Sequence, residues 1–227
     1  MVELTAEEAR KGNIGKMGQC LGELYSALWQ ETVQLHRRWS EYTELFGSKP
    51  SRVELLNSAA GTFFRYVQDG FWDGTLMHIA RLTDPPVSAG KTNLTIKSLP
   101  ELVDAKLKAN ISQLVEKAVS HAAFARDWRN RVLAHLDLDL ALDKSATPLA
   151  EASRKQARLA MEAIAAVMNA VEAHYMDSAT AYDFGKPLNG AVSLLYVLND
   201  GVHVREEREA RLAKGEFSQS DLDSPDL

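Results

Sequence analysis

Apolar residues recur at intervals of three, four and seven positions through most of the chain, which is the spacing of amphipathic helices. The longest such stretch covers residues 14–46, and a Gly-Ser-Lys-Pro segment at 47–50 ends it. Further stretches with this spacing follow at residues 51–82, 98–128, 149–176 and 191–198, and a charge-rich helical segment follows at 204–214. The pattern therefore predicts helices from one end of the chain to the other.

Local signals indicate where several of these helices begin and end. Thr5 with Glu8, and Ser51 with Glu54, have the spacing of capping boxes, in which each side chain bonds to the other residue's backbone. The Asp-Pro-Pro segment at 84–86 predicts a stop, because proline lacks an N–H donor and disfavours helix in the residue before it.

Glycines interrupt two of the predicted helices. Gly15, Gly18 and Gly22 weaken the start of the 14–46 helix, so they either allow a close approach of another helix or indicate that this helix begins later. Asp69 and Gly70 predict a kink in the 51–82 helix. At each of these positions the predicted helix either continues or breaks.

The strand-like alternation at residues 137–143 is isolated, so we interpret it as a helix end and a loop. The fold class is therefore all-α, an antiparallel bundle of about five or six main helices. We expect one helical domain over residues 1–204. Residues 205–227 should form a charged C-terminal helix and an acidic tail.

Composition narrows the class of protein. With 227 residues, 45% hydrophobic content and a mean hydropathy of -0.24, the chain has the make-up of a soluble globular protein. The formal net charge of -5 gives no global field that would attract nucleic acid. Cys20 is the single cysteine, no apolar leader is present and no run reaches the roughly 18 apolar residues of a membrane span. We expect a cytoplasmic protein without a membrane partner.

The only dense cluster of potentially catalytic groups lies at residues 125–137. It contains Arg129, Asn130 and, after four further residues, His135. The apolar stripe of the preceding helix continues onto Arg129, so this guanidinium points where an apolar residue is expected. His135 lies about 240° further around an ideal helix. Arg129 and His135 therefore either flank a groove or meet their counterparts in a second subunit.

A purely structural interpretation of this cluster is also open. An arginine six residues before a histidine is expected by chance in a chain of this composition, although the added asparagine makes the pattern rarer. In this interpretation Asp127 pairs with Arg131, and His135 caps the last carbonyls of a helix.

The cluster resembles the signature of the HEPN superfamily (higher eukaryotes and prokaryotes nucleotide-binding), in which a polar residue usually follows an arginine and a histidine comes after a short gap. The wider context resembles its AbiU-type branch, associated with abortive infection. This resemblance spans about residues 14–200 and rests on the segments Phe71-Trp72-Asp73, Ile79-Ala80-Arg81-Leu82-Thr83-Asp84-Pro85-Pro86, Asn93-Leu94-Thr95-Ile96 and Ala134-His135-Leu136-Asp137.

The resemblance implies a helical bundle that forms a homodimer and acts as a metal-independent endoribonuclease of a toxin–antitoxin or phage-defence system, without a cofactor. His135 would be the general base or acid at an RNA 2′-hydroxyl, Arg129 would stabilise charge on the scissile phosphate, and Asn130 would orient the phosphate or the histidine. Arg126 and Arg131 would contribute RNA binding through phosphates. The products would carry 2′,3′-cyclic phosphate ends, and an antitoxin protein is a possible partner.

Other sites are weaker candidates. Asp73, His78 and Asp84 suggest a metal site, but the first two are five residues apart, which is poor spacing for one helix face. The aspartates at 137, 139 and 143 lack the glycine and glutamate of a calcium loop. The alternative function is a catalytically inactive helical scaffold that binds a protein or nucleotide partner.

Overall fold

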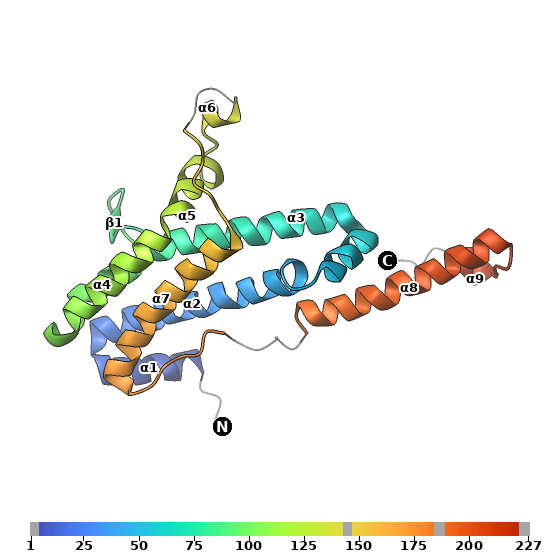
Figure 1. The fold of residues 1–227 in the computed structure, drawn as a ribbon. Coiled ribbons are helices and arrows are strands. Elements are labelled where there is room, and N and C mark those ends of the chain that lie inside the picture. Colours follow the sequence, from blue (N-terminus) through green and yellow to red (C-terminus); the bar gives the residue numbers. More distant parts are fainter. Residues whose placement is uncertain (1–4, 143–146, 184–188, 223–227) are drawn as a thin grey trace. The chain divides into compact units, whose positions relative to one another are not determined.

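The computed structural model describes residues 5–142, 147–183 and 189–222. The described chain is almost entirely helical, as the sequence predicts (Figure 1). Its longer helices are α1 (Ala6–Met17), α2 (Gln19–Phe46), α3 (Pro50–Leu82), α4 (Ala105–His121), α7 (Arg154–Met176) and α8 (Ala191–Lys214). No helix in the described ranges is both long and apolar enough to cross a membrane.

The chain divides into two compact units, and each is described separately. The large unit comprises residues 1–39 and 71–184, and the small unit comprises residues 40–70 and 185–227. Both α2 and α3 contribute residues to each unit.

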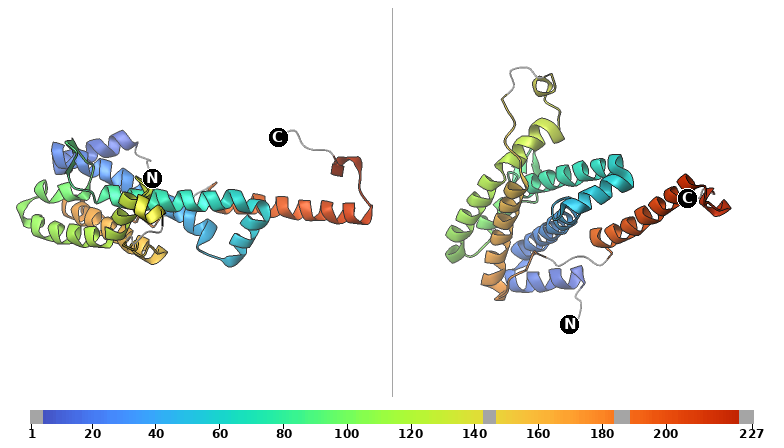
Figure 2. Two further views of the ribbon diagram at one scale, coloured as in Figure 1. Left: turned by 90° about the horizontal axis from the view of Figure 1, so that it is seen from above. Right: turned by 45° about the vertical axis from the view of Figure 1, so that its right-hand side comes forward.

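The core of the large unit is formed by α2, α3, α4 and α7. In Figures 1 and 2, α4 and α7 run side by side, and their apolar faces meet over most of their length. Alanines on α7 allow this close packing, because their small side chains let the backbones approach. The fully buried side chains include Leu28, Leu35, Leu76, Ile79, Ile111, Ala157, Ala160, Ile164, Val167 and Met168.

The helix predicted over residues 14–46 is two helices. The first of the two, α1, begins at the Thr5–Glu8 capping box, as predicted. It ends at Gly18, whose φ of 80° is a conformation that residues other than glycine rarely adopt. Gly22 lies where α2 passes α1, and a Cβ there would sit 2.6 Å from Ile14 Cα. Gly18 thus terminates a helix and Gly22 allows a close approach, whereas Gly15 faces open space.

We expect Gly22→Ala to lower the free energy of unfolding by about 1–3 kcal/mol, because its methyl group would overlap the Ile14 backbone. Gly15→Ala is the matched control, since nothing lies within 4 Å of its Cβ. That change should stabilise the chain by about 0.5–1 kcal/mol through helix propensity. Urea denaturation measures both, and equal stability of the two variants would contradict this account of the α1–α2 contact.

Helix α3 stops at Leu82, as predicted from the segment 84–86, but its irregularity is elsewhere. The non-helical backbone lies at Ala60 (φ -163°, ψ 68°), so the kink predicted at residues 69–70 is wrong. Two short strands, β1 (Val87–Ser88) and β2 (Lys91–Thr92), pair as an antiparallel hairpin after this stop.

Short helical segments lie on both sides of α4 between the hairpin and α7. They are a 3-10 helix η1 (Ile96–Glu101), the helix α5 (Ala123–Trp128), a π turn η2 (Arg129–Leu133) and α6 (Leu138–Ala141). The helix predicted from residue 98 therefore begins later, at Ala105, and α7 begins at Arg154 behind a Ser153–Gln156 capping box rather than at residue 149. The segment predicted as a helix end and a loop at 137–143 is, as far as residue 142, the separate short helix α6 behind its N-cap Asp137, so only the rejection of a strand there is confirmed.

The small unit has a separate apolar core of Leu45, Leu56, Phe64, Ala191 and Leu195. Helix α8 continues unbroken through residue 204, and the short helix α9 (Gln219–Leu222) follows it. The Ala191 N–H donates to Glu41 Oε2 at 2.5 Å, so a carboxylate from α2 occupies the start of α8.

Two histidines of the large unit are largely buried. Burial lowers the pKa of His36 to about 4, although the charge of nearby Asp183 opposes this shift. Burial also lowers the pKa of His78, whose Nε2 lies 2.9 Å from Glu31 Oε2 without proper hydrogen-bond geometry. Both imidazoles are therefore neutral in the folded chain at pH 7.

Acid should destabilise the fold through these histidines. In the unfolded chain His36 binds a proton below about pH 6.5, whereas in the folded chain it binds one only below about pH 4. Protonation therefore favours the unfolded state, and stability is lost as the pH falls from about 6.5 to about 4. We expect the free energy of unfolding to be lower by about 2 kcal/mol at pH 5 than at pH 7.5 from His36 alone. Urea titrations at both pH values check this. The loss should shrink in His36→Gln and persist in His203→Gln, which changes an exposed side chain.

Candidate active site

The predicted cluster at Arg129, Asn130 and His135 lies on and just after the π turn η2. There the Ala134 N–H donates to the Arg129 carbonyl at 2.8 Å, a bond over five residues instead of four. This wider turn moves His135 out of the register of the helix before it. Such π turns are rare and occur frequently at functional sites.

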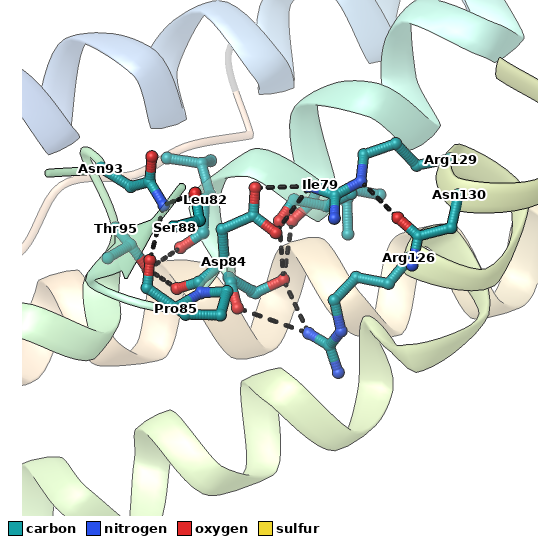
Figure 3. A network of polar contacts seen from close by, with 12 residues as sticks. Ile79, Leu82, Asp84, Pro85, Ser88, Asn93, Thr95, Arg126, Arg129 and Asn130 are labelled. Atoms are coloured by element: carbon teal, nitrogen blue, oxygen red, sulfur yellow. Dashed lines mark hydrogen bonds and ion pairs between the residues drawn. The ribbon is translucent and has the colours of Figure 1, made fainter. Parts of the chain in front are cut away.

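The Arg129 guanidinium is held in place by two neighbours. Its Nη1 lies 2.6 Å and 2.5 Å from the two carboxylate oxygens of Asp84, and its Nε donates to Asn130 Oδ1 at 3.0 Å (Figure 3). The side chains of Arg129 and Asp84 are only 23% and 14% exposed. Within the described ranges Nη2 has no hydrogen-bond partner. Nη1 and Nε are therefore fixed, and Nη2 is free to donate to a ligand.

Asp84 is itself anchored at the end of α3. Its N–H donates to the Arg81 carbonyl at 3.2 Å, and its own carbonyl accepts from Thr95 Oγ1 at 2.8 Å. Thr95 is buried and also donates to the Leu82 carbonyl at 3.1 Å. The segment after β2 thus fixes the carboxylate that fixes Arg129 (Figure 3).

Arg126, expected to contact RNA phosphates, directs its donors into the protein. Its Nη2 donates to the Val119 carbonyl at 2.8 Å and its Nη1 to Thr83 Oγ1 at 3.1 Å. Burial lowers the pKa of Arg126, with Arg129 adding to this and Asp84 opposing it. The side chain ties the end of α3 to the end of α4, while its charge remains beside Arg129.

Arg131, the second expected RNA contact, holds the segment before α7. Its Nη2 donates to the Thr147 carbonyl at 2.6 Å. Its Nη1 lies 3.7 Å from Asp127 Oδ1, which confirms the ion pair of the structural interpretation. The Ala150 N–H donates to Asp127 Oδ2 at 2.8 Å, and the Ala150 carbonyl accepts from Trp128 Nε1 at 2.8 Å. Three side chains within about one turn, Asp127, Trp128 and Arg131, therefore all bond the segment at 147–150.

His135 is exposed and makes no hydrogen bond or ion pair with the part of the chain that the structure describes. The helix-capping role considered for it is not seen. Instead, the Asp137 side chain accepts from the N–H groups of Asp139 and Leu140 at the start of α6. The imidazole is thus open to a ligand or a partner chain.

Two of the three residues considered for a metal site, His78 and Asp84, have other roles. His78 is buried next to Glu31, and Asp84 pairs with Arg129. Across residues 5–142, 147–183 and 189–222, no group of three His, Cys, Asp or Glu side chains lies close enough to hold a metal ion. The aspartate at position 143, named for a calcium loop, lies outside the described residues.

Sequence reasoning named the cluster but missed its organising carboxylate. Asp84 was visible as the residue before two prolines, as part of the segment at 79–86 that carries the family resemblance, and as one member of a weak metal set, but not as a partner of Arg129. Its partner Arg129 is 45 positions away, so helical spacing carries no signal for the pair. The π turn was missed because a five-residue backbone bond has no signature in hydropathy.

Comparison with known proteins bears on this site. A family model of the HEPN type, described as AbiU2, matches residues 18–192, which includes α2 to α7 and the whole cluster. No curated protein and no solved structure matches the chain.

Proposed function

The chain belongs to the HEPN AbiU2 family, and on this premise we propose that it is a metal-independent endoribonuclease of a toxin–antitoxin or phage-defence system. The supporting observation is the state of two side chains: Arg129 is oriented by Asp84 and Asn130 with Nη2 unoccupied, and His135 is exposed without a partner among described residues. A fixed cation and an open imidazole are what phosphoryl transfer at a 2′-hydroxyl requires.

In the proposed reaction His135 takes the proton of the RNA 2′-hydroxyl, because histidine as a residue type exchanges protons near neutral pH. The 2′ oxygen attacks the adjacent phosphorus, and the bond from phosphorus to the 5′ oxygen breaks. The leaving oxygen takes a proton from water or from the histidine of a second copy. The products are a 2′,3′-cyclic phosphate and a 5′-hydroxyl.

Arg129 stabilises the negative charge that develops on the phosphate oxygens during this step. Its planar guanidinium is anchored on one side, so Nη2 can donate to the phosphate without a large loss of side-chain freedom. Asn130 fixes Nε and thus orients the arginine. Arg126 and Arg131 add positive charge around the site, although their hydrogen bonds with the described residues go to protein groups.

The proposal includes a homodimer, a cytoplasmic location and inhibition by an antitoxin protein. In a dimer, His135 of the second copy could donate the proton that the leaving 5′ oxygen takes up. A dimer would also cover apolar side chains near the site, since Leu136 and Leu138 are both 68% exposed.

Inducible expression tests the proposal in cells. Wild type should arrest growth and degrade RNA, whereas Arg129→Ala and His135→Ala should do neither, because each removes one half of the chemistry. Arg65→Ala is a matched control, since Arg65 is exposed and its one ion pair among the described residues is with Asp69 at a distance of 3.6 Å. Growth curves and RNA integrity are the measurements. Equal toxicity of all four proteins would exclude the cluster as the catalytic site.

An inactive scaffold is the alternative function, and the Asp84–Arg129 pair is the observation that favours it. The carboxylate neutralises the one cation that a phosphate would need, in a chain of net charge -5. Under this alternative, purified wild type cleaves no RNA but still binds a partner protein through the exposed residues around His135.

A further inference from the structure

The turn that follows α3 is held by residues from the segment after the hairpin. Each carbonyl from residue 82 to residue 86 accepts a hydrogen bond from a residue at least seven positions further along the chain. Asn93 and Thr95 make four of these five bonds, and Arg126 makes the fifth. Pro85 and Pro86 have no N–H of their own, so the turn depends on donors from outside it.

Asn93 fixes the proline part of the turn. Its Nδ2 donates to the Pro85 carbonyl at 2.7 Å and to Ser88 Oγ at 2.8 Å (Figure 3). Its N–H donates to the Pro86 carbonyl at 2.8 Å. One residue thus sets the direction in which the chain leaves Asp84.

Thr95 fixes the part of the turn that carries the carboxylate. Its hydroxyl lies 2.8 Å from the Asp84 carbonyl and 3.1 Å from the Leu82 carbonyl, so one proton serves both acceptors (Figure 3). The Lys97 N–H donates to the same oxygen at 3.3 Å, which orients it. Thr95 is fully buried, and loss of its hydroxyl would leave the two carbonyls without this donor.

The position of this turn decides where the Asp84 carboxylate lies relative to Arg129. Both carboxylate oxygens are within 2.6 Å of Arg129 Nη1, and hydrogen bonds this short weaken steeply when their geometry changes. On the other side of the turn, Arg126 Nη1 donates to the Thr83 carbonyl at 3.4 Å and to Thr83 Oγ1 at 3.1 Å. A displaced turn would therefore release the guanidinium.

We propose that Thr95, supported by Asn93, is a positioning residue for Arg129. Its hydroxyl sets the Asp84 main chain, and the Asp84 carboxylate in turn sets the rotational position of the guanidinium. The hold on Arg129 is a property of the folded chain alone. Its effect on RNA cleavage rests on the proposed function.

Rotation of the Arg129 guanidinium about its Nε–Cζ bond measures this hold directly, because an anchored Nη1 slows the rotation. In full-length protein labelled with ¹³C and ¹⁵N at arginine, exchange between the two Nη signals gives the rotation rate. Arg129→Lys assigns these signals by their loss. Thr95→Val keeps the shape of the side chain and removes its hydroxyl, so the rate should rise at least about tenfold, the scale of one hydrogen bond to a charged group.

Two variants separate positioning from general destabilisation. Thr95→Ser keeps the hydroxyl and should rotate within about threefold of the wild-type rate. Thr32→Val also removes a fully buried threonine hydroxyl, which donates to the Leu28 carbonyl at 2.8 Å within α2, and should leave the rate unchanged. An unchanged rate in Thr95→Val, or an equal rise in Thr32→Val, would overturn the proposal.

Asn93→Ala decides the question if Thr95→Val does not fold. It removes both bonds from Nδ2 at a residue that is only partly buried. The rotation rate should rise at least about threefold, because the turn loses one of its donors. A wild-type rate in this variant would overturn the proposal.

Single-turnover RNA cleavage distinguishes failure of this inference from failure of the proposed function. Thr95→Val should cleave about three- to tenfold more slowly than wild type, and Thr95→Ser should restore the rate. If Thr95→Val rotates faster but cleaves like wild type, the positioning role is wrong and the proposed function stands. If wild type cleaves no RNA while the rotation rates change as expected, the proposed function is wrong and the hold on Arg129 stands.

Discussion

Arg129→Ala is expected to lower RNA cleavage by about 10²–10³-fold, because it removes the donor that stabilises charge developing on the phosphate. Arg129→Lys should recover little of this loss. Lysine keeps the charge, but its single ammonium cannot bond Asp84 and Asn130 while also reaching a phosphate, as the guanidinium does through Nη1, Nε and Nη2. Single-turnover rates on a defined RNA measure the effect.

The control for this prediction is Arg81→Ala. Arg81 is close to Asp84 in sequence, and its side chain is 61% exposed and lies 3.9 Å from Glu31. This variant removes a nearby positive charge without touching the Asp84–Arg129 pair, so its cleavage rate should stay within a few-fold of wild type. A loss in Arg81→Ala as large as that in Arg129→Ala would assign the effect to general electrostatics instead of the oriented guanidinium.

Asp84→Ala is expected to have the second-largest effect, on stability and activity together. It leaves a guanidinium that is 23% exposed without its carboxylate, which should lower the free energy of unfolding by about 1–3 kcal/mol after allowance for its partial exposure. Cleavage should fall about 10–100-fold, because Arg129 loses its orientation. Urea denaturation and cleavage rates measure the two effects.

A double-mutant cycle separates the pair from other effects of Asp84. In the Arg129→Ala background, Asp84→Ala should cost little further activity, because the side chain that it positions is already absent. Asp69→Ala is the matched control, since Asp69 belongs to an exposed i,i+4 pair with Arg65 and should cost below about 1 kcal/mol. Additive losses in the cycle, or higher activity in Asp84→Ala, would contradict a positioning role for Asp84.

The helical fold could be predicted from the sequence because its determinants are local. Capping at Thr5–Glu8 and the proline stop at 84–86 depend on residues within one turn of each other, and both are seen. The kink was misplaced because Ala60, where the backbone departs from helix, carries no glycine or proline signal. Likewise, the choice between the two roles of Gly22 depended on Ile14 of another helix.

The candidate site was predictable only in part for the same reason. Arg129 and His135 were visible because they lie six residues apart within one segment. The other contacts of the site depend on how α3 meets α4 and α5. Arg126 bonds the Val119 carbonyl and Thr83, and Asp84 holds Arg129. Tertiary contacts of this kind decide whether a charged side chain faces a substrate or its own protein, and hydropathy spacing does not record them.

The most direct test of the proposed function is RNA cleavage by purified wild type and His135→Ala, with analysis of the product ends. The account predicts that wild type leaves 2′,3′-cyclic phosphate and 5′-hydroxyl ends, and that a single 2′-deoxy substitution blocks cleavage at that position. His135→Ala should be slower by about 10²–10⁴-fold. Cleavage at the same rate and positions by both proteins would contradict the account.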